Sequence, residues 1–211
     1  MDPTLIVFIG LAAFVAYKLF SVLGTRTGHE QRHDLEAVQA SRGGDARHEP
    51  APAPKPVKAL GPVSAAAEPL RAADPDFDEK AFLEGARGAY EMVVEAFAGG
   101  DLKSIRRYLG QSVYDAFKAA LVEREANGWT HELKFVGIDS AKVVSSGAEN
   151  AELSAIVDFS SNQVRVTRDK DGNVVDGDPA RIDLVKDRWT FSRALSSNDP
   201  NWILVATGGA G

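Results

Sequence analysis

The sequence lacks cysteine altogether, and its 211 residues include only four histidines. Without cysteine the chain can form no disulfide and no thiolate metal site, and it has no cysteine nucleophile. His29, His33 and His48 fall in a polar stretch without periodicity, and His131 stands alone. A protein metal site needs several ligands at short spacings, so we expect no metal ion and no cofactor.

Positive charge is also scarce, with 24 Lys and Arg against 30 Asp and Glu. The imbalance lies beyond residue 75, where 16 Lys and Arg face 22 Asp and Glu. An acidic surface repels the phosphates of nucleic acid at long range. We therefore expect no nucleic-acid partner, although Arg106 and Arg107 can form a local basic strip.

What the sequence does contain is one long apolar run, residues 4–23, with Lys18 as its single charge. A helix of about 20 residues spans the roughly 30 Å hydrocarbon core of a bilayer. A cleaved secretory signal would begin with basic residues, whereas Asp2 precedes this run, and an organelle transit peptide would be Arg-rich and amphipathic. We predict that residues 1–23 form a single transmembrane anchor.

Arg26 and Arg32 follow the apolar run, and basic flanks are retained on the cytoplasmic side, so we expect the remaining chain in the cytoplasm. Residues 24–75 lose all periodicity and are rich in Pro, Ala and Gly, with HEPAPAPKPVKALGP at their centre. This composition predicts a flexible linker with a reach of roughly 40 Å. A Pro-rich docking motif is the alternative interpretation.

Residues 76–211 are patterned as a folded domain. Apolar residues at helical spacing predict a long helix that Gly99 and Gly100 end. Its stripe consists of Phe82, Ala86, Ala89, Val93 and Phe97, with Tyr90 beside it. Two further helices are expected: a short one capped by Asp101, over about 102–109, and a longer one over about 112–127.

Beyond Gly128 apolar and polar residues alternate with period two, which predicts strands at 130–145, 151–160, 163–169, 181–194 and 201–207. Helices followed by consecutive antiparallel strands predict an α+β domain with the helices on one face of a curved sheet. The acidic segment 169–178 lacks the Gly and Glu positions of an EF-hand loop. We therefore expect a hairpin turn there rather than a calcium site.

Asp158 and His131 are the one pair that could act as general base and acid, and the sequence does not show whether they meet. A solvated or structural role is the default for both. A second candidate is aromatic, because Trp189 and Phe191 share one face of a strand and Trp202 could lie across from it. Core packing is the default for these residues, and a ligand or partner groove is the alternative.

Several stretches, in this order, resemble the Tim44-like domain family: FLEGARGAYEMVVEAFAGGD at 82–101, YDAFKAALVEREANG at 114–128, and then WTFSR, NDPNW and LVAT. The resemblance covers about residues 76–207. The family includes a mitochondrial inner-membrane translocase subunit, a mitochondrial ribosomal branch and bacterial membrane-anchored adaptors. The apolar start and Pro-rich tether are similar to the bacterial, TimA-like branch, because a mitochondrial member would carry a transit peptide.

The resemblance implies a cone like that of nuclear transport factor 2, in which helices pack on a strongly bent sheet around a hydrophobic pocket. The candidate pocket or partner surface consists of Tyr90, Phe117, Phe159, Trp189, Phe191 and Trp202. Gly85 and Gly88 interrupt the long helix at a cost of roughly 1 kcal/mol each. In this fold they are expected to let the helix approach the sheet or a neighbouring helix closely, with Gly88 the more sensitive position.

We interpret the chain as a membrane-tethered, non-enzymatic adaptor that recruits protein partners to the cytoplasmic face of the bacterial inner membrane, in protein translocation or envelope assembly. Two alternatives stay open: an isomerase- or dehydratase-type enzyme with Asp158 or His131 as base, and a carrier of a hydrophobic ligand. Pocket chemistry discriminates between them. Buried polar groups that converge on a cavity favour the enzyme, whereas an apolar pocket with a bare rim favours the adaptor.

Overall fold

The computed structural model describes residues 60–197 and 199–210. The predicted anchor at 4–23 and the part of the predicted linker up to residue 59 lie outside the described residues. Within the described part, no helix combines the length and the apolar character needed to cross a membrane.

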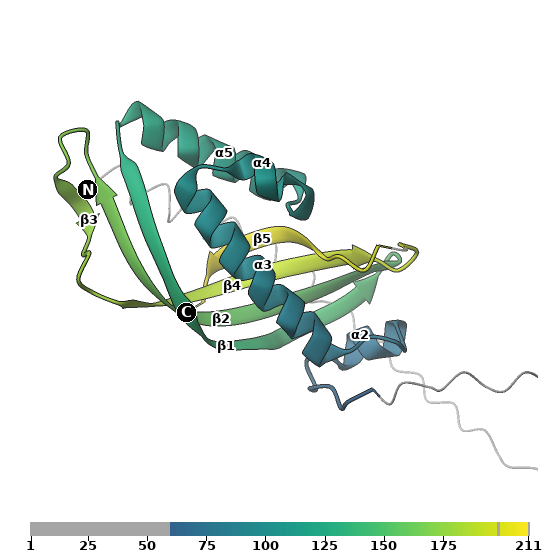
Figure 1. Ribbon diagram of the computed structural model, residues 1–211. Helices are drawn as coiled ribbons and strands as arrows, with labels where there is room; N and C mark the ends of the chain where they lie inside the picture. Colours follow the sequence, from purple (N-terminus) through teal and green to yellow (C-terminus); the bar gives the residue numbers. More distant parts are fainter. Residues whose placement is uncertain (1–59, 198, 211) are drawn as a thin grey trace, which may run out of the picture. The chain divides into compact units, whose positions relative to one another are not determined.

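Helices precede strands along the chain (Figure 1). The helices are α2 (Glu68–Ala73), α3 (Glu79–Gly99), α4 (Leu102–Ile105), the 3-10 turn η1 (Arg106–Tyr108) and α5 (Gln111–Ala126). The strands are β1 (Thr130–Glu149), β2 (Glu152–Arg168), β3 (Val174–Gly177), β4 (Asp183–Ala194) and β5 (Ile203–Gly209).

The strands form one antiparallel sheet in the order β1-β2-β4-β5, and β3 pairs with β2. Figure 1 shows α3 lying across the inner face of this curved sheet, with α5 near one end. The predicted α+β class with a curved antiparallel sheet is therefore confirmed.

The curvature has a local cause in β1. Its pairing with β2 shifts register three times, around Val136, Asp139 and Val144. An extra residue in one strand of an antiparallel pair bends that strand and increases its twist. Repeated bulges along one long strand thus curl the sheet around α3.

The first two strands are longer than predicted. A two-residue turn joins them, and its residues Asn150 and Ala151 both have positive φ, 52° and 62°, the combination that suits a tight hairpin. β2 also continues through residue 161, where the sequence analysis wrongly breaks it in two. Ser161 is fully buried and pairs with Val185 of β4, so tertiary pairing continues the strand across a polar stretch.

The acidic segment 169–178 forms the predicted hairpin, because β3 pairs with the end of β2. The Asp169 carboxylate organises the turn by accepting the backbone N–H groups of Asp171 and Asn173, each at 2.9 Å. Hydrogen bonds from Asn173 lower the pKa of this exposed carboxyl group.

Helix α3 begins and ends where its sequence dictates. The Asp78 side chain caps it by accepting two backbone N–H groups of the first turn at 3.0 and 3.1 Å. Gly100 ends it with a φ of 79°, and the N–H of Asp101 then bonds the carbonyl of Ala96 at 2.8 Å. The predicted caps of the next two helices are also present, since Asp101 accepts the Ser104 N–H at 3.2 Å and α5 ends at Ala126.

The folded part begins earlier than residue 76, where the sequence analysis places the end of the linker. Ala67 and Leu70, at the start and in the middle of α2, have no exposed surface. The Ser64 hydroxyl donates to Glu79 at 2.7 Å, which ties this segment to the start of α3. The six residues of α2 have too weak a helical pattern to be predicted from the sequence, because the burial of this helix depends on contacts with distant parts of the chain.

The interpretation of the two helical glycines as close-packing sites is wrong. Gly85 and Gly88 are both exposed, and a Cβ atom added to either one would have no atom of the surrounding structure within 4 Å. The side of α3 that faces the sheet carries Phe82, Ala86 and Tyr90 instead. Neither glycine is therefore needed for the approach of the helix to the sheet.

Candidate functional site

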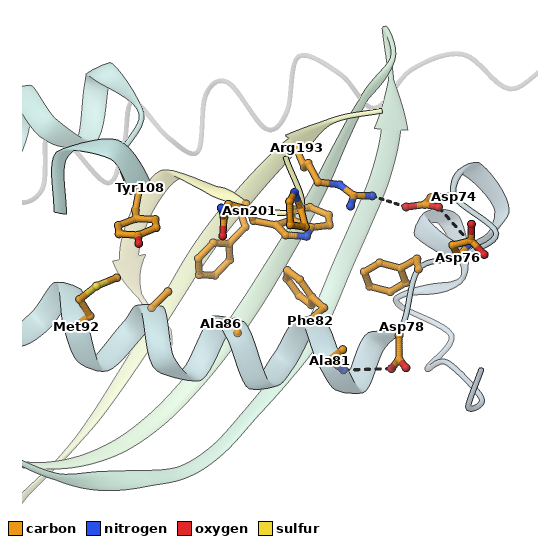
Figure 2. A pocket seen from close by; sticks show the side chains of 16 residues that line it. Asp74, Asp76, Asp78, Ala81, Phe82, Ala86, Met92, Tyr108, Arg193 and Asn201 are labelled. Carbon is orange, nitrogen blue, oxygen red and sulfur yellow. Dashed lines mark hydrogen bonds and ion pairs between the residues drawn. The ribbon is translucent and has the colours of Figure 1, made fainter. Parts of the chain in front are cut away.

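An open groove of about 540 Å³ runs along the first four turns of α3 (Figure 2). Small side chains line its α3 wall at Ala81, Gly85 and Ala89, because they recur every four residues on one side of the helix. Met92 and Tyr108 stand at one end of the groove (Figure 2). Gly85 makes no close packing contact, and its missing side chain leaves open space in this groove.

Aromatic rings form the floor of the groove. The ring centroids of Phe82 and Trp202 are 4.7 Å apart. The Phe77 ring lies 6.2 Å from Trp202, and the Phe191 ring lies 6.0 Å from Phe82. Trp202 is half-buried, and its ring carries the guanidinium of Arg193 at 5.3 Å. Phe77, Phe82 and Phe191 are buried, so Trp202 is the one of these four rings that keeps a substantial exposed surface.

Three aspartates, Asp74, Asp76 and Asp78, gather at the end of the groove where α3 begins (Figure 2). Asp74 pairs with Arg193, and Asp78 caps α3. Asp76 is exposed, and among the described residues its carboxylate accepts no hydrogen bond. The loop is held in place by Arg71, whose Nε donates to the carbonyl of Phe77 at 2.6 Å.

Two arginines lie near the opposite end of the groove, where Tyr108 is a lining residue, although neither arginine lines the groove itself. The Arg107 guanidinium stacks on the Tyr108 ring with its centre 4.7 Å from the ring centroid, and the Arg106 guanidinium stacks on Tyr114 at 4.5 Å. Both arginines are exposed. The lining of the groove is therefore acidic at the start of α3 and apolar along its floor, and Arg107 lies next to its other end, on the Tyr108 ring.

A second cavity, of about 260 Å³ and at least as open to solvent as the groove, lies beside the last two turns of α3 and shares no lining residue with the groove. Its apolar walls come from Val93, Val94, Phe97, Ala98, Phe117, Leu133, Val185 and Trp189. Its polar lining consists of His131, Gln163, Arg165, Asp187 and Thr207.

A buried polar cluster centred on Tyr90 adjoins this cavity. The Tyr90 hydroxyl donates to Oδ2 of Asp187 at 2.6 Å, and the side-chain amide of Gln163 donates to Tyr90 at 3.0 Å and to Ser161 at 2.9 Å. Burial and the Asp187 carboxylate raise the pKa of Tyr90, so the phenol stays protonated. Burial also raises the pKa of Asp187, against the Tyr90 bond and the charge of Arg165.

The six aromatic residues that the sequence analysis names as pocket candidates divide into three pairs. Phe191 and Trp202 line the groove, and Phe117 and Trp189 line the cavity. Tyr90 and Phe159 stack between them in the core, with ring centroids 4.5 Å apart. The fold therefore brings four of these residues to two separate sites and buries the other two in the core.

Asp158 and His131 lie on opposite faces of the sheet. Asp158 sits outside and binds Arg188 through two bonds of 2.6 and 2.8 Å, which lower the pKa of its carboxyl group. His131 lines the inner cavity and contacts Thr167 through Nδ1 at 2.9 Å. Burial, followed by the charges of two nearby arginines, lowers the pKa of its imidazole. They form no acid–base pair.

Several residues of these sites were not anticipated. Gln163 and Asp187 belong to the inner cavity although they read as ordinary polar strand residues. Asp74 was assigned to the linker. The cluster DPDFD, directly before the long helix, was the one available signal for the acidic end of the groove. Within residues 60–197 and 199–210, no group of three or more His, Cys, Asp or Glu side chains is placed to hold a metal ion.

Comparison with known families matches a sequence model of the Tim44-like domain to residues 63–209. The chain belongs to the Tim44-like domain family. The Tim44-like domain thus includes α2 and both sites described above. Its start agrees with the early beginning of the folded part.

Among curated proteins, this Tim44-like chain is similar to the mitochondrial import inner membrane translocase subunit TIM44 of Homo sapiens, with 23% identity over 128 residues. That match covers 60% of this chain but only 28% of the human protein. Among solved structures, the intermembrane space region of chloroplast protein ARC6 superposes with a TM-score of 0.43 and 12% identity. The superposition covers 64% of this chain and 98% of the ARC6 chain. Its TM-score is too low to establish a shared fold.

Proposed function

We propose that this protein is a membrane-tethered, non-enzymatic adaptor of the bacterial TimA-like branch. Residues 1–23 anchor it in the inner membrane, a Pro-rich linker follows, and the Tim44-like domain recruits protein partners on the cytoplasmic side, in protein translocation or envelope assembly. The family membership and the similarity to an inner membrane translocase subunit support this proposal. The bent sheet with α3 on its inner face supports a cone like that of nuclear transport factor 2.

One observation carries the proposal, namely the open aromatic groove along α3. Trp202 is partly exposed beside charged residues, whereas Phe77, Phe82 and Phe191 are buried. Such a ring can bind a partner protein, because its burial supplies affinity and the neighbouring charges set orientation. The groove offers Trp202 and Phe82 as its floor and Asp76 at one end. Tyr108 lines the other end, and Arg107 stacks on the Tyr108 ring.

The chemistry of the groove defines the partner it fits. An apolar segment with a basic residue at one end and an acidic residue at the other would place both charges opposite their complements. A helix commonly has acidic residues in its first turn and basic residues in its last turn. Such a helix would lie antiparallel to α3, with its C-terminal end at Asp76.

The rival proposal of an enzyme based on Asp158 and His131 loses support, because the sheet separates the two side chains. Polar groups do converge on the inner cavity, but they are Tyr90, Gln163 and Asp187. That cavity shares no lining residue with the groove, so these polar groups do not belong to the proposed partner site.

A matched pair of substitutions tests the adaptor proposal. Gly85→Leu and Gly88→Leu place the same side chain on the same exposed helix, but only Gly85 lines the groove. A photocrosslinking residue introduced at Ala89 of the full chain, in intact membranes, would report partner contact. We expect the crosslinked products to persist in Gly88→Leu and to disappear in Gly85→Leu.

Charge reversal provides a second arm. Asp76→Lys changes the acidic end of the groove, whereas Glu91→Lys changes an exposed position of α3 that lines neither site. We expect loss of crosslinking only for Asp76→Lys. Equal crosslinking in all four variants would refute the groove as the partner site.

A further inference from the structure

The buried cluster beside the inner cavity leaves acceptor atoms without partners. The single hydrogen of the Tyr90 hydroxyl goes to Asp187, so Ser161 donates to Tyr90, and the Gln163 amide group donates to both hydroxyl oxygens. Among the described residues, neither Oδ1 of Asp187 nor Oε1 of Gln163 accepts a hydrogen bond. A molecule in the cavity with a hydrogen to donate can replace water as the partner of these oxygens.

These two oxygens are also accessible. Across the described residues, only Nε of Arg193 is a fully buried side-chain polar atom without a partner. The unpartnered oxygens of Asp187 and Gln163 are therefore not sealed in the core, and both residues line the cavity.

The charges around the cavity favour a neutral ligand. The Arg165 guanidinium lies near enough to Asp187 to oppose the rise of its pKa, and Asp183 lies 3.8 Å from Arg165. Burial lowers the pKa of His131, so its imidazole is neutral at neutral pH. A cationic ligand would be repelled by Arg165 and an anionic ligand by Asp187.

The walls and the size of the cavity define the rest of the ligand. The walls are aliphatic and aromatic, with Phe97, Phe117 and Trp189 among them. An apolar protein cavity of about 150 Å³ accepts benzene. The cavity of about 260 Å³ should therefore hold about ten non-hydrogen atoms.

We propose that this inner cavity binds a small neutral hydrophobic molecule with one hydroxyl group, such as an alkylphenol or a medium-chain alcohol, which donates its hydroxyl hydrogen to Asp187. The site is independent of the groove, because the two share no lining residue. The adaptor function can therefore fail its test without affecting this proposal, and the reverse also holds.

The probe is 4-propylphenol, and the reporter is the fluorescence of Trp189 in the full chain after replacement of Trp129 and Trp202 by Phe. Trp189 lines the cavity, whereas Trp202 lines the groove. We expect saturable quenching by 4-propylphenol. Propylbenzene, which lacks the hydroxyl group, should bind at least tenfold more weakly.

The decisive variant is Asp187→Asn. The side-chain oxygen of the asparagine can still accept a hydrogen bond from Tyr90, while its NH₂ group replaces Oδ1, the acceptor proposed for the ligand. The affinity for 4-propylphenol should therefore fall at least tenfold, with little change for propylbenzene. Asp158→Asn, on the outer face of the sheet, should leave both affinities unchanged. Equal binding of both compounds, equal binding to Asp187→Asn, or no saturable response would overturn the proposal.

A second variant keeps the test informative if Asp187→Asn fails to fold. Val94→Phe enlarges a wall residue on α3 that takes no part in the polar cluster. We expect it to abolish binding of 4-propylphenol, and undiminished binding would also overturn the proposal.

Discussion

The Tyr90 hydroxyl lies 2.6 Å from Oδ2 of Asp187, and this hydrogen bond joins the middle of α3 to β4 across 97 positions of sequence. Tyr90 has no exposed surface, and its ring also stacks on Phe159. The bond lies where the groove-lining half of α3 passes into the cavity-lining half. Tyr90 itself lines neither site, and it lies on α3 between the residues that line the groove and those that line the cavity.

Tyr90→Phe should lower the free energy of unfolding by about 1 to 3 kcal/mol, because it leaves the polar atoms of Asp187, Ser161 and Gln163 without their shared partner. Tyr114→Phe is the matched control, since Arg106 stacks on its ring and that contact does not require the hydroxyl group. It should change stability by less than about 0.5 kcal/mol. Urea unfolding of both variants measures the difference, and equal stabilities would show that the Tyr90 cluster is not stabilising.

Asp187→Asn should alter the pH dependence of stability. Because burial raises the pKa of Asp187 in the folded state, the folded chain takes up this proton at higher pH than the unfolded chain. Wild-type stability relative to Asp187→Asn should therefore rise as pH falls through the raised folded-state pKa, and level off below the ordinary value. Urea unfolding of both proteins across this acidic range tests the sign, and a relative loss of wild-type stability would contradict the raised pKa.

Gly88→Ala should raise the free energy of unfolding by up to about 1 kcal/mol, because the added methyl group meets no neighbour and Ala favours the helix. Gly88→Leu should likewise not destabilise the domain, in contrast to the close-packing hypothesis. Gly100→Ala is the opposite control, since its φ of 79° costs a residue with a Cβ atom about 1 to 2 kcal/mol. Thermal unfolding measures these differences. A lower unfolding midpoint for Gly88→Ala than for the wild type would show that Gly88 has a packing role.

Asp158→Ala and His131→Ala should each leave the biological phenotype intact, because the two residues lie on opposite faces of the sheet. Loss of the exposed Asp158–Arg188 ion pair should cost no more than about 1 kcal/mol. Complementation of a deletion strain, with circular dichroism to verify folding, checks both variants. Loss of function in a folded variant would favour an enzyme.

Deletion of residues 1–23 should release the chain from membranes, because the rest of the sequence has no comparable apolar run and carries an acidic excess. Fractionation of cells that express the full and the shortened chains measures this. If the shortened chain still pelleted with membranes after a high-salt wash, the domain would have to bind membrane by itself.

The sequence alone predicts the local structure, that is, the ends of helices and the turns. The extent of α3 follows from its apolar spacing together with the Asp78 cap and Gly100, and each of these acts within a few residues of the helix end. The hairpin at 169–178 follows in the same way from Asp169 and its neighbours. Such features depend on backbone hydrogen bonds between near neighbours, so the sequence alone determines them.

The sites depended on the tertiary structure. The sequence places Tyr90 beside the apolar stripe of the long helix and Asp187 in a strand. Only the register of β4 against β2 and the crossing of α3 bring their side chains within 2.6 Å. The same packing turns Gly85 toward the groove, leaves Gly88 in solvent, and separates Asp158 from His131. Periodicity specifies which side chains share a face of an element, whereas the element that covers that face is decided by contacts between residues far apart in the chain.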